Sequence, residues 1–185
     1  MEKNQNQYEQ VLNRILIKSP CSVVLPQDID SASFTDSFLE AYGEPLGKGK
    51  IMPVRIKCGE FPDAVSLWKE FAMKIKEAMP AVYGGDIITT RCFMAIEGAS
   101  TTDVIKSYLI RIFSLIEGKS DCMFLLVMED FENVIEKMAE FDIMKVRGMT
   151  TYAVILSITH TDLRKLCENK YGHAYFCNQF VTFRF

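Results

Sequence analysis

The stretch Val23-Val24-Leu25-Pro26-Gln27-Asp28-Ile29-Asp30-Ser31-Ala32-Ser33 sets the expected fold, because it joins a short apolar run to a helical pattern. The apolar residues at 22–25 predict a buried strand. Apolar residues then recur at helical spacing between Ser33 and Tyr42, which predicts a helix. A buried strand that leads through a polar loop into a helix is typical of a parallel α/β sheet.

The same alternation continues on both sides of this unit. Helical patterns occur at 8–16, 61–79, 100–117, 131–141 and 160–170, and strand patterns at 51–57, 123–128, 152–156 and 180–185. The run 123–128 is apolar throughout, as expected of a central parallel strand covered on both faces. The sequence therefore predicts one α/β domain over residues 1–185, with three α/β/α layers and a mostly parallel five-stranded sheet.

Two segments lack such a pattern. Residues 43–50 contain three glycines and a proline and predict a turn-rich connection, without the spacing or the following helix of a phosphate-binding loop. We expect 80–99 to be irregular, with a possible short strand near Cys92-Phe93-Met94.

The amino-acid composition limits the classes of function that fit this sequence. The 185 residues are 49% apolar, which suits one domain with a substantial core. The net charge of -3 and pI of about 5.5 give no general attraction to nucleic acid or to anionic membranes. No apolar run reaches the roughly 18 residues of a membrane span, and the polar N-terminus is unlike a secretory signal. We therefore expect a cytoplasmic protein with a protein partner, and neither nucleic acid nor a membrane.

The six cysteines are scattered and form no C-x-x-C pair. Inside strands and helices, free cysteines act as small hydrophobic residues. Cys167, His173 and Cys177 could be imagined as metal ligands, but their spacing matches no common zinc pattern.

Polar residues follow three of the predicted strands, where open α/β sheets place their ligands. These are the loop at 26–33, the pair Glu129-Asp130, and Ser157-Ile158-Thr159. The loop has the length and position of the phosphate-binding pattern G-x-x-x-x-G-K-[ST]. Its glycine positions hold Pro26 and Ser31, its lysine position holds Ala32, and only the hydroxyl of Ser33 agrees.

In order and spacing, the three segments resemble the Walker A, Walker B and sensor-1 positions of AAA+ and STAND-type P-loop ATPases, above all the ORC-like ATPase domains. The resemblance covers most of the chain and includes the closing strand Gln179-Phe180-Val181-Thr182-Phe183. It implies a P-loop NTPase-like sheet of order 5-1-4-3-2. Active AAA+ ATPases carry a helical lid after the last strand, and we expect no C-terminal lid here.

The resemblance also implies roles for individual residues. Glu129 and Asp130 would hold Mg²⁺ and polarise the attacking water, and Thr159 or Ser157 would orient the water and the γ-phosphate. Ser31, Ala32 and Ser33 occupy the nucleotide-binding positions of the loop, and Ser33 with Glu129 would bind the metal. ATP and Mg²⁺ are the cofactors that a retained activity would need.

The loop residues argue against that activity. Proline has no N–H, and without glycines the loop cannot follow its tight path around phosphates. The lysine is missing, and Asp28 and Asp30 add negative charge where phosphates would lie. We therefore predict a degenerate ATPase-like domain that acts as a binding or regulatory module, without efficient ATP hydrolysis and without a cofactor.

The same acidic residues allow an alternative. Asp28 and Asp30, together with Glu129 and Asp130, could form an oxygen-rich Mg²⁺ site in a nucleotide- or phosphate-handling enzyme of the ATPase or phosphatase type. Phosphatases of the HAD type use such a D-x-D loop, but Pro26-Gln27 interrupt the approach to it here. A third possibility is a purely structural subunit of a heteromeric assembly.

Overall fold

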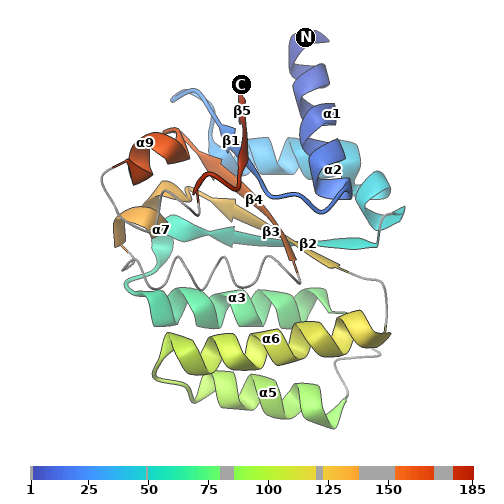
Figure 1. Ribbon diagram of the computed structural model, residues 1–185, viewed down its shortest axis with the longest axis vertical. Helices are drawn as coiled ribbons and strands as arrows, with labels where there is room; N and C mark the ends of the chain where they lie inside the picture. The colour runs from blue at the N-terminus through green and yellow to red at the C-terminus, as the bar shows by residue number, and fades with distance from the viewer. Residues whose placement is uncertain (1, 49, 80–85, 120–122, 138–152, 169–176) are drawn as a thin grey trace.

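The structure is a computed structural model, which describes residues 2–48, 50–79, 86–119, 123–137, 153–168 and 177–185. Its helices and strands alternate along the chain, as Figure 1 shows. In chain order they are α1 (Glu2–Leu16), β1 (Cys21–Val24), α2 (Ser31–Lys48), β2 (Ile51–Lys57), a 3₁₀ turn (Cys58–Glu60), α3 (Ala64–Ala78), α5 (Ile87–Glu97), α6 (Thr102–Lys119), β3 (Met123–Glu129), α7 (Glu132–Lys137), β4 (Ala153–Thr159), α9 (Leu163–Cys167) and β5 (Val181–Arg184).

The five strands form one parallel sheet in the order β2-β3-β4-β1-β5. Read from its other edge, this is the order 5-1-4-3-2, so the predicted fold class and strand order are confirmed. All residues of β3 and β4 are buried, because these strands lie inside the sheet with helices over both faces.

Helices cover the two faces of the sheet unequally (Figure 1). α1 and α2 lie on one face, where Phe34 and Phe38 of α2 join a core cluster with Val127 of β3. α3, α5 and α6 lie on the opposite face and, with α7 and α9, enclose the larger cluster around Trp68 and Phe124. The two faces therefore have separate cores that meet only through the strands.

The prediction of an irregular segment at 80–99 is wrong for its described part, because α5 occupies Ile87–Glu97. The Asp86 side chain begins this helix by accepting hydrogen bonds from the N–H groups of Ile88 and Thr89. Its buried residues follow helical spacing: Thr89, Cys92, Phe93 and Ile96. That spacing is the signal that indicates a helix rather than a strand around Cys92.

The prediction of a turn-rich connection over 43–50 is also wrong, because α2 continues through Gly43 and Pro45 to Lys48. Proline inside a helix removes one hydrogen bond and clashes with the preceding turn. The fully buried Leu46, however, packs into the core with Phe38 and holds this last part of the helix against the sheet. Tertiary packing thus outweighs the local preference of the sequence.

Helix α1 begins at Glu2, six residues before the predicted start at residue 8. The other elements agree with the predicted ones to within a few residues, with helix α7 at Glu132–Lys137 and helix α9 at Leu163–Cys167. Residues 138–141 and 169–170, predicted to be helical, lie outside the described part of the chain. Cys167 and Cys177 are joined by a disulfide, whereas His173 lies outside the described residues.

Helix α1 ends in a Schellman motif. The N–H of Ser19 donates to the Arg14 carbonyl at 3.0 Å, and the N–H of Lys18 donates to the Ile15 carbonyl at 2.9 Å. Lys18 lies in the left-handed region at φ 60°. Glycine is the residue that usually occupies this position.

Candidate functional site at the carboxyl ends of the strands

Direct contacts join the three segments at the carboxyl ends of the strands, as the sequence predicts. Ser31, at the start of α2, donates its hydroxyl to Asp130 Oδ1 at 2.5 Å. His160, directly after β4, places Nε2 3.0 Å from the Ile29 carbonyl. The loop between β1 and α2 therefore touches the residues that follow both β3 and β4.

The N-terminus of α2 is closed by a side chain of its own loop. Asp30 Oδ2 accepts hydrogen bonds from the Ser33 N–H at 2.9 Å and from the Ser33 hydroxyl at 3.1 Å. The backbone N–H of Ser33, and then its hydroxyl, hold the pKa of Asp30 below its ordinary value. A carboxylate thus occupies the anion-attracting end of this helix.

Glu129, the last residue of β3, is paired with an arginine from the neighbouring strand. Its side chain is only 2% exposed, and its Oε1 accepts a hydrogen bond from Arg55 Nε at 2.5 Å. Arg55 also donates through Nη1 to Asp36 at 2.5 Å and through Nη2 to the Ala32 carbonyl at 3.2 Å. Burial opposes the charge of Arg55, but the hydrogen bonds and negative charges of Glu129 and Asp36 together outweigh it and raise the pKa of Arg55.

Asp130 adopts a left-handed backbone conformation, with φ 51°. Few residues other than glycine adopt this region, although aspartate tolerates it better than most. The conformation turns the chain out of β3 and lets the Phe131 N–H donate to the Ile158 carbonyl at 3.0 Å. The Asp130 carboxylate accepts the Ser31 hydroxyl and thereby ties the end of β3 to the start of α2.

The hydroxyls predicted to orient water and phosphate lie inside the sheet. Thr159 is buried and donates its hydroxyl to the Val23 carbonyl at 3.4 Å. Ser157 is buried too, and its hydroxyl has no hydrogen-bond partner among the described residues. Among the loop residues, Ser31 is buried, Ala32 half-buried and Ser33 exposed.

His160 and Glu132 form a contact that the sequence did not predict. Glu132 Oε1 accepts the His160 N–H at 3.0 Å and lies 3.3 Å from His160 Nδ1. Burial would lower the pKa of His160, but hydrogen bonds with the Ile29 carbonyl and Glu132 raise it above its ordinary value of 6.5. One imidazole therefore bridges the first loop and α7.

Arg55 is the other residue of the candidate site that sequence analysis missed. A cation between Val54 and Ile56 in a predicted strand is unusual, and that is the only signal that the sequence gives. Its partner Glu129 is 74 residues away along the chain. The parallel register pairs Lys57 with Glu129 and so places Arg55 on the same face, one pleat away.

A cavity of about 340 Å³ lies beside this ion pair, at the β2 edge of the sheet. It is lined by Ala32, Arg55, Ile56, Lys57, Phe61, Glu70, Lys74 and Glu129. No residue of the loop before α2 lines it. Among the described residues, no three histidine, cysteine or acidic side chains are grouped closely enough to hold a metal ion.

No protein-family model matches the sequence, and no curated protein matches it. Solved structures do. The structure of the Aeropyrum pernix ORC1 protein in complex with DNA aligns over 98% of this chain and 44% of its own, at TM-score 0.66 and 8% identity. Cdc6p from Pyrobaculum aerophilum aligns over 100% of this chain and 45% of its own, at TM-score 0.61 and 12% identity.

A third match, Drosophila ORC bound to AT-rich DNA and Cdc6, aligns over 100% of this chain and 54% of its own, at TM-score 0.59 and 14% identity. The chain thus spans about half the length of these proteins. It shares the fold of these ORC and Cdc6 structures. The predicted resemblance to ORC-like ATPase domains is therefore confirmed for the fold.

These structures also correct the prediction about partners. The prediction that nothing indicates nucleic acid is wrong, because two of the three are complexes with DNA. Net charge was the basis of that prediction, and a net charge does not describe how charges are distributed over a surface. Within the described residues, no helix has the length and apolar character of a membrane span.

Proposed function

We propose that this AAA+-like domain acts as a binding or regulatory module that does not hydrolyse ATP efficiently. The observation that carries the proposal is the Arg55–Glu129 pair. The carboxylate expected to approach Mg²⁺ is 2% exposed and accepts a 2.5 Å hydrogen bond from a guanidinium. An arginine so close to this carboxylate competes with a metal cation for it.

The loop supports the same conclusion. A phosphate-binding loop needs successive free N–H groups and a lysine ammonium around the phosphates. Here Pro26 supplies no N–H, the Ser33 N–H is bonded to Asp30, and Ala32 stands in place of the lysine. The residues present do not fit a nucleotide with its magnesium ion, and we propose that neither is a cofactor of this domain.

Calorimetric titration with ATP·Mg²⁺ and with ADP tests the proposal. We expect no binding in the micromolar range. Micromolar affinity for ATP·Mg²⁺ that is lost in Glu129→Gln would refute it and would favour the Mg²⁺-dependent enzyme. The matched control is Glu132→Gln, which changes a neighbouring carboxylate that contacts His160 rather than Arg55.

Nucleic acid is a second candidate ligand, favoured by the DNA complexes among the similar structures. A labelled DNA duplex titrated with the protein at several salt concentrations tests it by fluorescence anisotropy. Binding that weakens steeply with salt would support phosphate contacts, because neutralised phosphates release counterions. Unchanged anisotropy at high protein concentration and low salt would exclude this role.

A further inference from the structure

Strand β5 lies at one edge of the sheet, and within the described residues only its inner side is paired. The N–H groups of Val181 and Phe185 donate inward to the carbonyls of Pro20 and Val24, at 3.3 and 3.1 Å. Main-chain groups of alternate residues in a strand point to opposite sides, so those of Thr182 point to the open edge.

Helix α1 runs along this edge and already contacts it at one point. Gln7 Nε2 donates to the outward carbonyl of Arg184 at 2.6 Å. Gln10, Arg14 and Ile17 continue along the same side of the helix at spacings of three or four residues. These three residues form a mixed polar and apolar row on α1, which faces the edge of β5 on the C-terminal side of Gln7.

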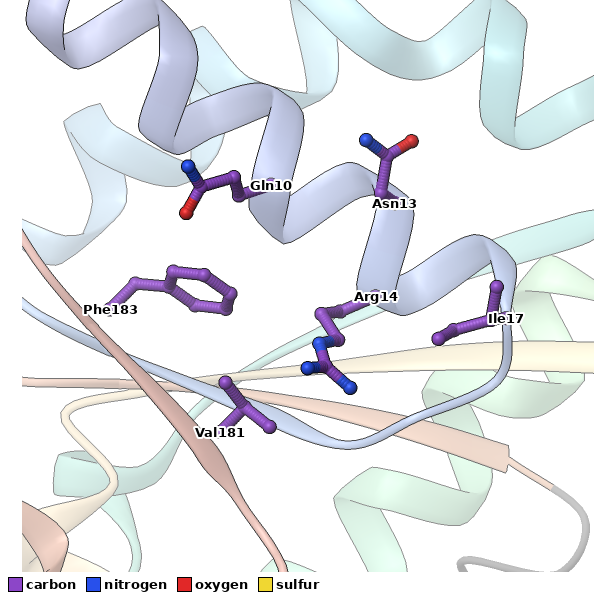
Figure 2. Close-up of a pocket in the computed structure, with 6 residues that line it drawn as sticks. All are labelled: Gln10, Asn13, Arg14, Ile17, Val181 and Phe183. Carbon is purple, nitrogen blue, oxygen red and sulfur yellow. The ribbon is translucent and has the colours of Figure 1, made fainter.

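A groove of about 420 Å³ lies between this row and β5. Figure 2 shows Arg14 pointing from α1 toward Val181, with Phe183 and Ile17 on either side. Ile17 is 67% exposed, which is high for an isoleucine at a helix end. The groove thus has apolar walls and lies beside the strand residue Thr182, whose main-chain groups point to the open edge.

Charge indicates the kind of segment that fits. Arg14 is the only charged residue among the six described residues that line the groove: Gln10, Asn13, Arg14, Ile17, Val181 and Phe183. A second copy of β5 would offer Val181-Thr182-Phe183-Arg184, whose only charge is another cation. Because Arg184 is already paired with Asp162, a second copy would bring no carboxylate to meet Arg14, whereas an acidic segment would complement Arg14.

We propose that the outer edge of β5 binds an extended acidic segment of another protein. The segment pairs with the main chain at Thr182 and places a carboxylate against Arg14 and an apolar side chain against Phe183. Main-chain pairing supplies affinity, and the side-chain contacts supply selectivity. This proposal rests on the proposed binding role and names the class of partner for it. Its test involves no nucleotide, so either proposal can fail while the other stands.

The test uses synthetic peptides of about eight residues, in which valine and threonine alternate so that the peptide favours an extended strand. One peptide has a central glutamate, and a second has lysine there. Anisotropy of the labelled peptides gives the affinities, and amide NMR of the ¹⁵N-labelled protein locates the site. We expect the glutamate peptide to bind about tenfold or more tightly than the lysine peptide, with shifts at Thr182 and Arg184.

Two controls separate this interface from non-specific binding. Arg14→Glu should reverse the preference between the two peptides, whereas Arg111→Glu, an exposed arginine on α6, should leave it unchanged. A glutamate peptide that is N-methylated along one edge has lost the N–H groups that would pair with β5, so it should lose its affinity for the protein. This comparison requires no change to the protein.

Three results would overturn the proposal. The first is no binding of the glutamate peptide at about millimolar concentration, a weak limit for strand addition. The second is equal binding of the N-methylated and unmethylated peptides. The third is a dimer in sedimentation experiments that Arg14→Glu dissociates, because the edge would then belong to a second copy.

Discussion

Replacing Arg55 by methionine should leave the buried Glu129 carboxylate without an opposite charge. Methionine keeps much of the length of the side chain and removes all three donor contacts, to Glu129, Asp36 and the Ala32 carbonyl. Removing one partner of a fully buried ion pair costs about 3–5 kcal/mol. Because the Arg55 side chain is 35% exposed, water screens part of that interaction. We therefore expect a loss of about 2–3 kcal/mol in the free energy of unfolding.

Urea denaturation at pH 7 measures this cost. Adding Glu129→Gln to Arg55→Met should recover about half of the loss or more, since a neutral amide is cheaper to bury than a carboxylate. Glu129→Gln alone should cost less than Arg55→Met, because Arg55 keeps Asp36 and reaches water.

A cost below about 0.5 kcal/mol for Arg55→Met, the range of an ordinary surface substitution, would contradict this prediction. A double variant no more stable than Arg55→Met would contradict it too. Either result would mean that Glu129 finds water or another donor once the guanidinium is gone.

Three further predictions concern other contacts. Lys18→Gly should stabilise the domain by about 1 kcal/mol in urea denaturation by relieving the left-handed backbone at the end of α1, and Lys18→Ala should give no such gain. Ser31→Ala should cost about 1–2 kcal/mol in the same assay, because Asp130 loses a hydrogen bond in a partly buried site; an unchanged midpoint would contradict this. NMR titration should give His160 a pKa above 6.5, so the stability it contributes is complete below pH 6.5 and is lost as the pH rises through its pKa; His160→Asn should remove that pH dependence.

Local patterns predicted the elements whose burial is uniform or periodic. The apolar run 123–128 gave the central strand β3, and helical spacing gave α3 and α6. Helix α5 was predictable in the same way from Thr89, Cys92 and Phe93. The continuation of α2 through Pro45 was not, because it depends on the packing of Leu46 against residues that are remote in sequence.

The site was predicted in its location but not in its contacts. Glu129, Asp130 and Thr159 do lie at the carboxyl ends of strands beside the first loop. Their partners, however, depend on which strands are neighbours and in what register. Arg55 reaches Glu129 only because β2 and β3 pair side by side, and no local pattern contains that information.

The contacts of Arg55 have a consequence for a lysine introduced at position 32. Its guanidinium holds the Ala32 carbonyl, at the position where a nucleotide-binding loop would carry its lysine. A lysine at position 32 would crowd two cations together while Pro26 and Asp30 still block the loop, so Ala32→Lys alone should leave ATP affinity unchanged in calorimetry. A cation at this one position is therefore not enough to make the loop a phosphate site, because the carboxylate of Asp30 and the missing N–H of Pro26 would remain.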